Sequence, residues 1–318
     1  MGTVLGVDLG GTAVKWVVRA DRPSADELLV EGSFPTGASR PAIVDDLIDL
    51  VRRVDVEHGA VSAVGVGVPG SVDRSSGVVR FLPNVAGEWA GYPLGATLTQ
   101  AIGRPTGILN DARAFCLAEL TLGAARGHAD AMFLTLGTGV GGGVVTGGRL
   151  LVGPDDRLGE LGHLTYDRTG PRCGCGNRGC LEMYASGPAL VNGVHERIGP
   201  RYGTAAAVLA AAEAGDGAAL EVAARAGRAI GETLASLCAV LPASVVVIGG
   251  GVSGGLPVLR PYIEEALAER ESFIGSVAVA AAELGPIAGA VGAALAAAST
   301  SAAGLDADSH DRSERRSA

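Results

Sequence analysis

Four side chains that could bind a metal ion lie close together in the sequence: His163, Cys173, Cys175 and Cys180. Zinc favours four tetrahedral nitrogen and sulfur ligands, and the glycines between the cysteines let the backbone turn tightly enough for three sulfurs to converge. The spacing is tighter than in ordinary zinc fingers, and three reduced thiols, or a disulfide and a spare thiol, are the alternatives. The nearby histidine favours metal, and because four protein ligands leave no position for water, we predict a structural zinc.

Three glycine-rich turns each follow an apolar run that is typical of a buried strand. Glycine lets backbone N–H groups approach phosphate oxygens, and threonine adds a hydroxyl donor. The stretch 137–142 matches the residue pattern of a dinucleotide-binding fingerprint but not its structural context, because it leads into a strand and not a helix. Any one turn could be a plain hairpin, but three of them, with Asp8 just before the first, predict nucleotide phosphates and a magnesium ion near Asp8. The predicted phosphate-binding residues are Gly10, Gly11, Thr12, Gly137, Thr138, Gly139, Gly249, Gly250 and Gly251.

Asn110 and Asp111 lie where a strand is expected to end and a helix to begin. One interpretation is a helix N-cap, because both residue types favour that position. The other is a ligand site, because a strand-end carboxylate of an α/β sheet points into the ligand crevice. Carboxylates and amides also bind sugar hydroxyls, and an imidazole can bind zinc through one nitrogen and a ligand through the other. The candidate sugar ligands are Asn84, Asn110, Asp111, Glu160, His163 and Glu182.

The pattern of apolar residues predicts the elements that carry these side chains. Three short β-branched runs parted by turns indicate an antiparallel meander over 4–7, 14–18 and 28–34. Helical spacing follows at 42–57, and the alternation of strands and helices continues through 61–68, 93–102, 106–109 and 112–122.

The strand and turn over 132–139 resemble those over 5–12, and each is followed by a second apolar strand. Chance similarity between two glycine-rich turns would explain this, but so would a duplicated α/β domain with its binding site in a cleft between the copies. Later elements are helices at 185–196, 205–214 and 218–240, a buried strand at 244–248, and a strand, turn and core helix over 277–298. The polar residues 299–318 predict a disordered tail.

Composition limits the function classes. The chain has 318 residues, of which 47% are hydrophobic, 19% are charged and only 4% are aromatic. The net charge of −9 and the lack of a basic stripe argue against a nucleic-acid partner. The N-terminus lacks the basic and apolar regions of a signal peptide, and no run is suited to span a membrane. We expect a cytoplasmic protein.

The motifs occur in an order that resembles the ROK family of sugar kinases and sugar-responsive repressors, within the actin-like ATPase superfamily. They are Asp8-x-Gly10-Gly11-Thr12-x-x-Lys15, Pro83-Asn84, Asn110-Asp111-Ala112, Gly137-Thr138-Gly139, Glu160-x-Gly162-His163 and Cys173-x-Cys175 to Cys180-x-Glu182. The resemblance implies an α/β, two-lobed actin-like ATPase fold (duplicated and ribonuclease H-like) with an inter-lobe cleft. The lobes would cover 1–112, completed by a helix near 287–298, and 113–286 with the zinc motif.

The resemblance also implies an ATP-dependent kinase for a primary hydroxyl of a hexose or hexose-like molecule. Asp111 would be the catalytic base, with Gly70 lining the sugar pocket, Lys15 on the nucleotide side, and ATP, Mg²⁺ and structural Zn²⁺ as cofactors. Glucose is the default substrate, with mannose, N-acetylmannosamine, fructose, allose or a cyclitol as alternatives. A regulator is disfavoured because no helix-turn-helix precedes the first strand. A homodimer or homotetramer is expected.

Two departures from the family pattern bear on the sugar: Arg113 replaces a frequent asparagine, and Leu109 replaces a frequent glutamate. The loop 153–157 before Glu160 is also unusually charged for a position where small residues are common. The sequence adjacency of His163 and Glu182 to the cysteines predicts that zinc organises the sugar site. The phosphate turns lie far away in the sequence, so the same adjacency predicts that loss of zinc leaves the KM for ATP nearly unchanged.

Overall fold

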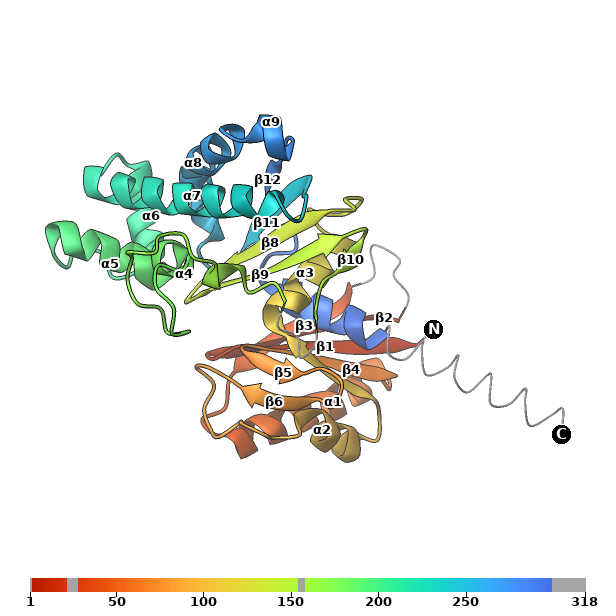
Figure 1. The fold of residues 1–318 in the computed structure, drawn as a ribbon. Coiled ribbons are helices and arrows are strands. Elements are labelled where there is room, and N and C mark those ends of the chain that lie inside the picture. The colour runs from red at the N-terminus through yellow and green to blue at the C-terminus, as the bar shows by residue number, and fades with distance from the viewer. Residues whose placement is uncertain (1, 22–27, 154–157, 299–318) are drawn as a thin grey trace. The chain divides into compact units, whose positions relative to one another are not determined.

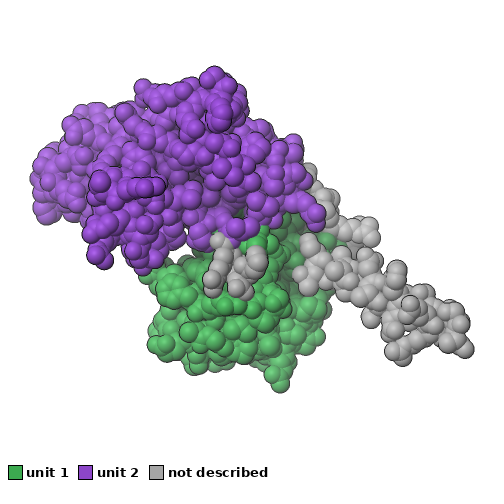
Figure 2. All heavy atoms as spheres, in the orientation of Figure 1, with its two compact units in different colours: residues 1–118, 152–157, 287–318 green, residues 119–151, 158–286 purple. Residues whose placement is uncertain are grey.

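The computed structural model describes residues 2–21, 28–153 and 158–298, so the predicted tail at 299–318 lies outside the described residues. The chain divides into two compact units (Figure 2). Unit 1 comprises Met1–Ala118, Val152–Arg157 and Ile287–Ala318, and unit 2 comprises Glu119–Leu151 and Leu158–Pro286. The predicted lobe boundary at 112/113 falls six residues before the observed division, and the predicted boundary after 286 coincides with it.

Unit 1 is built on a five-stranded sheet in the order β3-β2-β1-β4-β7 (Figure 1). The strands β1 (Thr3–Leu9), β2 (Ala13–Ala20) and β3 (Leu28–Pro35) form the predicted antiparallel meander. The strands β4 (Ala63–Val68) and β7 (Thr106–Asn110) run parallel to β1. A short hairpin of β5 (Ser71–Asp73) and β6 (Val78–Phe81) was not predicted.

Alternation along the strands separates two faces of this sheet. One face carries Leu5, Val7 and Leu9 of β1 and packs against α1 (Arg40–His58) and α2 (Leu94–Ile102). The other face carries Gly6 on β1 and Gly65 on β4, and it packs against the helix over 288–298. A Cβ at Gly6 would lie 2.6 Å from the backbone nitrogen of Ala294, so the close approach requires glycine. The helix α3 (Asp111–Thr121) also lies against this second face, where Ala114 packs with Leu109 and Ala293.

Unit 2 repeats the same strand order. Its sheet runs β10-β9-β8-β11-β12, which is again the third, second, first, fourth and fifth strand in chain order. The strands β8 (Ala131–Leu136), β9 (Val140–Thr146) and β10 (Arg149–Leu150) are antiparallel, and β11 (Val245–Gly249) and β12 (Ala278–Ala281) are parallel to β8. Matching orders are not expected from chance similarity of two turns, and the predicted duplication is confirmed.

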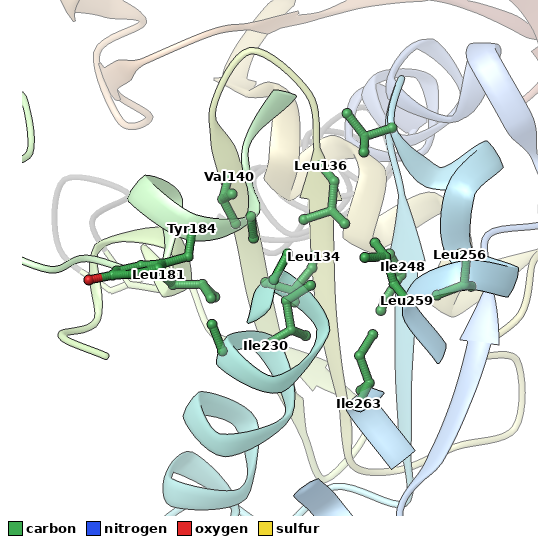
Figure 3. Close-up of a cluster of buried hydrophobic side chains, with 14 of the residues drawn as sticks. Leu134, Leu136, Val140, Leu181, Tyr184, Ile230, Ile248, Leu256, Leu259 and Ile263 are labelled. Carbon is green, nitrogen blue, oxygen red and sulfur yellow. The ribbon is translucent and has the colours of Figure 1, made fainter. Parts of the chain in front are cut away.

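Helices complete unit 2. They are α4 (Glu182–Ala185), α5 (Gly187–Ile198), α6 (Ala205–Glu213), α7 (Gly217–Cys238), α8 (Leu256–Ala268) and α9 (Glu271–Ile274). The helix α8 was not predicted, because Pro257 at its start and Pro261 inside it obscure the helical pattern. Figure 3 shows the apolar cluster in which side chains of α7, α8 and α4 meet those of β8 and β11. Within the described residues, no helix is long and apolar enough to cross a membrane.

Candidate active site and metal centre

In unit 1, the predicted ligands gather at the carboxyl ends of parallel strands. The register places Asp8 of β1 beside Gly67 of β4, and Val68 of β4 beside Asn110 of β7. Gly70 lies two residues after the end of β4, with Pro69 between them. The carboxyl edge of a parallel sheet is where ligands bind in α/β folds, so this edge is a candidate site.

The turn Gly10–Thr12 joins β1 to β2 and is tied to the end of β3. The Thr36 hydroxyl donates to the Gly10 carbonyl at 2.6 Å, and the Thr36 amide donates to the Thr12 carbonyl at 3.0 Å. Gly11 lies against Asn84, because a Cβ at Gly11 would be 2.5 Å from the Asn84 carbonyl oxygen. Asn84 itself has a φ of 61°, a left-handed conformation that asparagine tolerates. The structure therefore brings a predicted phosphate turn and a predicted sugar ligand into contact.

Asp8 lies on the same face of β1 as Gly6, and its carboxyl group packs against Gly289 of the helix over 288–298. Burial raises the pKa of the Asp8 carboxyl, and the charge of Lys15, its cross-strand neighbour, opposes that rise. A desolvated carboxylate gains from a cation that replaces lost water. The Asp8 oxygens fit the hard oxygen ligands that magnesium prefers.

Asn110 and Asp111 have different structural roles. The Asn110 side chain accepts from the Arg113 amide at 3.1 Å and donates to the Gly70 carbonyl at 2.8 Å. Asn110 is thus the cap of α3 and also fixes the end of β4. Asp111 is the first residue of α3, half-buried, and its Oδ1 accepts from the Ala112 amide at 2.7 Å. Asn110 is therefore the N-cap of α3, and its hydrogen bonds fix the position of Asp111, the next residue.

The two departures from the family pattern lie in the protein interior. Leu109 is buried against Ala114, Ala293 and Ala296, which lie on α3 and on the helix over 288–298. Arg113 is also buried, one turn into α3. Leu109 therefore contributes to the packing beneath the helix over 288–298.

In unit 2, the other two glycine turns lie side by side. Gly137–Gly139 joins β8 to β9, with the Gly137 amide donating to the Gly139 carbonyl at 2.9 Å. The Val252 amide donates to the Leu136 carbonyl at 2.9 Å, and a Cβ at Gly250 would lie 2.5 Å from that same oxygen. Thr138 and Gly251 are exposed, and Gly249 ends β11.

The four predicted metal ligands also converge in unit 2. One ligand atom of each of His163, Cys173, Cys175 and Cys180 lies within 4.8 Å of all the others. The Cys173 sulfur is 3.6 Å from His163 Nδ1, and the Cys175 and Cys180 sulfurs are 3.6 Å apart. All five cysteines of the chain are described, and none forms a disulfide.

These distances fit a tetrahedral zinc. Ligands at about 2.0–2.3 Å from zinc are separated by roughly 3.4–3.8 Å along the edges of a tetrahedron. Burial raises the pKa of Cys180 to about 12 and also raises the pKa of Cys173, so both sulfurs remain thiols unless a cation stabilises the thiolates. With Nδ1 facing the sulfurs, His163 keeps Nε2 for another partner.

The remaining candidates flank this cluster. Glu160 is exposed and precedes the short helical turn Leu161–His163. Glu182 begins α4, and its Oε1 lies 3.7 Å from the Cys173 sulfur. Its other oxygen, Oε2, accepts from the Val140 amide at 3.0 Å, directly after the turn Gly137–Gly139. This phosphate turn is therefore close to the zinc motif, although the two lie far apart in the sequence. The predicted effect of zinc loss on the KM for ATP rested on that separation in the sequence, and it stays a prediction.

Some residues of these sites were missed in the sequence. Thr36 and Gly289 contact the first phosphate turn and Asp8, and Gly162 packs closely on Val140. Gly162 belongs to the Glu160–His163 motif and so could have been suspected. Thr36 and Gly289 lack a local signal, because only the tertiary fold brings them to their partners.

Two α/β units with one strand order, each with a glycine turn after its first strand, define the actin-like ATPase class of fold that the sequence predicted. The model of the ROK family matches residues 4–300, and the chain belongs to that family.

Curated relatives include a glucokinase of Thermotoga maritima, 36% identical over 92% of this chain and 96% of the relative. An N-acetylmannosamine kinase of Shigella flexneri is 33% identical over 83% of this chain and 89% of the relative. Among solved structures, a ROK hexokinase from Thermus thermophilus has a TM-score of 0.81 at 37% identity, covering 93% of this chain and 97% of that one. A ROK family glucokinase from Streptomyces griseus, in complex with glucose and AMPPNP, has a TM-score of 0.76 at 33% identity, covering 93% and 99%.

Proposed function

We propose that this protein is an ATP-dependent kinase that phosphorylates a primary hydroxyl of a hexose or hexose-like sugar, with glucose as the first candidate. The observation that carries the proposal is the arrangement of Asn110 and Asp111. Asn110 caps α3 and bonds to Gly70, so it fixes Asp111 at the edge of the sheet where α/β proteins bind ligands. The glucokinase relatives support the choice of glucose.

In this mechanism, the Asp111 carboxylate accepts the proton of the sugar hydroxyl while the hydroxyl oxygen attacks the γ-phosphorus of ATP. The bond between that phosphorus and the bridging oxygen breaks, and ADP leaves. Phosphoryl transfer has a loose transition state with little nucleophile bonding, so alignment and neutralisation of charge are the enzyme's main tasks. A carboxylate that accepts the proton and orients the hydroxyl serves the first task. The proposed sugar ligands of unit 1 are Gly70, Asn84, Asn110 and Asp111, and those of unit 2 are Glu160, His163 and Glu182.

The nucleotide would be bound by backbone amides of the glycine turns. The proposed residues are Gly10, Gly11, Thr12, Lys15, Gly137, Thr138, Gly139, Gly249, Gly250 and Gly251. Asp8 would hold a magnesium ion, which supplies charge neutralisation for the phosphate oxygens. His163, Cys173, Cys175 and Cys180 would hold a structural zinc, as their spacing supports.

A second candidate substrate is N-acetylmannosamine, which the similarity to the Shigella flexneri kinase favours. A coupled assay of ADP release separates the candidates, with glucose, mannose, N-acetylmannosamine, fructose, allose and a cyclitol compared at matched concentrations. We expect the highest kcat/KM with glucose and ATP. A higher value for N-acetylmannosamine would replace glucose by the second candidate, and no ADP release with any acceptor would refute the kinase proposal.

The location and oligomeric state of the enzyme are also proposals. We propose the cytoplasm, because the reaction depends on ATP. We also propose a homodimer or homotetramer. Light scattering behind a sizing column would measure the mass, and a single species near the 31.6 kDa of one chain would contradict the oligomer.

A further inference from the structure

The first residue of β9, Val140, is held on both sides of its backbone by segments that carry zinc ligands. Its amide donates to Glu182 Oε2 at 3.0 Å, and Glu182 lies two residues after Cys180. Its other side packs against Gly162, the neighbour of His163. A Cβ at Gly162 would lie 2.8 Å from the Val140 Cβ and closer still to its carbonyl oxygen. Two ligand-bearing segments therefore hold the strand that begins at the phosphate turn.

Glu182 contacts the turn itself as well. A Cβ at Gly139 would lie 2.6 Å from Glu182 Oε2, so the absence of a side chain at Gly139 makes room for the carboxylate. The other oxygen, Oε1, is 3.7 Å from the Cys173 sulfur. One carboxylate thus reaches from the metal cluster to the turn. A carboxylate would repel a phosphate, so its contribution to nucleotide binding is to hold the turn in place.

The segment that carries Glu182 is firmly anchored. Leu181 is fully buried and Tyr184 nearly so, and both belong with Val140 and Leu134 to the apolar cluster of unit 2 drawn in Figure 3. The Leu181 amide donates to the Leu164 carbonyl at 2.9 Å, which joins the segment after Cys180 to the segment after His163. A displacement of either ligand-bearing segment would therefore be transmitted to the other.

The turn needs such external support. It contains two glycines, which restrict the backbone least, and its own hydrogen bond runs from the Gly137 amide to the Gly139 carbonyl. The Gly137 carbonyl also accepts from the Gly187 amide at 2.7 Å, at the start of α5. Only Ser186 separates Gly187 from the end of α4, so a further contact of the turn comes from the same segment as Glu182.

We infer that the zinc motif positions the phosphate turn Gly137–Gly139, with Glu182 as the positioning residue, and that nucleotide affinity depends on the motif even without sugar. The inference rests on the proposed function, because it takes the turn as a nucleotide site. It adds a role for Glu182 on the nucleotide side to its proposed role as a sugar ligand.

The test is the equilibrium affinity for AMPPNP with magnesium, measured by calorimetry in the absence of sugar. Glu182→Ala removes the acceptor, Glu182→Gln keeps a neutral one, and Glu213→Ala on the exposed face of α6 is the matched control. Hydrogen bonds to charged acceptors are the stronger class, so we expect Glu182→Ala to weaken binding about tenfold or more. Glu182→Gln should be intermediate, and the control should equal the native protein.

A second measurement does not depend on nucleotide. Amide hydrogen exchange at Val140 should be slower in the native protein than in Glu182→Ala, and removal of zinc by a chelator should speed it as well. Native AMPPNP affinity together with native Val140 protection in Glu182→Ala would overturn the inference. If the native protein binds no AMPPNP, the proposed function fails, and the exchange rate of Val140 still decides whether the motif holds the turn. If Glu182→Ala does not fold, Glu182→Gln must show faster exchange, and unchanged exchange would overturn the inference.

Discussion

Gly65 lies on β4 beneath the helix over 288–298, and replacing it by alanine tests how unit 1 is assembled. A Cβ at Gly65 would lie 2.6 Å from the Ala293 carbonyl carbon and closer still to its oxygen. Ordinary contact begins at about 3.4 Å, so the helix has to move by more than about 0.8 Å, because the oxygen is closer than the carbon. Both partners are backbone, and no rotamer change can relieve the overlap.

Overpacking of this kind costs about 1–3 kcal/mol. Since 1 kcal/mol shifts the melting temperature of a unit of this size by about 2–4 °C, Gly65→Ala should melt about 2–12 °C lower. Gly107 on β7 of the same sheet is the matched control, because a Cβ there would meet nothing within 4 Å. Circular dichroism melts of both variants would measure the effect, and Gly65→Ala melting together with the native protein and Gly107→Ala would refute the packing argument.

Further predictions concern stability and metal. The paired hydrogen bonds from Arg104 lower the pKa of Asp55, so the pair stabilises the fold above the unfolded pKa of about 3.9 and loses that effect as pH falls through the lower folded pKa. Asp55→Asn should therefore lower the free energy of unfolding in urea by about 1–3 kcal/mol at pH 7. The difference in free energy of unfolding between native protein and variant should shrink at acid pH, and a difference that stays constant would contradict this. Cys175→Ser should lower zinc content from the one ion per chain expected by elemental analysis, and active native enzyme without zinc would contradict the metal site. The buried Glu119 carboxylate accepts amides of 124, 283 and 284, so Glu119→Ala should cost about 3 kcal/mol or more in urea, and a loss below 1 kcal/mol would contradict its role.

Much of the fold could be predicted from local pattern. The meander of β1, β2 and β3 was evident because each strand is a short β-branched run closed by a turn. The duplication was suggested by two glycine turns and is confirmed by two sheets of one strand order. The hairpin of β5 and β6 was missed because its strands are short and its turn depends on Asp73, which accepts the amides of Ser75 and Ser76.

The site was predictable where its residues are close in sequence. The cysteine cluster has a local spacing, and the structure brings its four ligand atoms together. The contact of Glu182 with Val140 joins residues that are 42 positions apart, and Asp8 meets Gly289 from the other end of the chain. Neither contact has a sequence signal, because each arises only when separate elements pack. For this reason, the adjacency of His163 and Glu182 to the cysteines in the sequence predicted a link between zinc and the sugar ligands, but no link between zinc and the phosphate turn.

The most direct test of the kinase account is the rate of sugar phosphate formation by the native protein and by Asp111→Asn, followed by ³¹P NMR with glucose, ATP and magnesium. Removal of a general base costs about 10²–10⁴-fold in turnover. We predict that the native protein forms the phosphate ester and that Asp111→Asn loses kcat on this scale, while its affinities for glucose and AMPPNP stay within a few fold of native. An Asp111→Asn variant that keeps most of its kcat would contradict the account, because Asp111 would then serve only the start of α3.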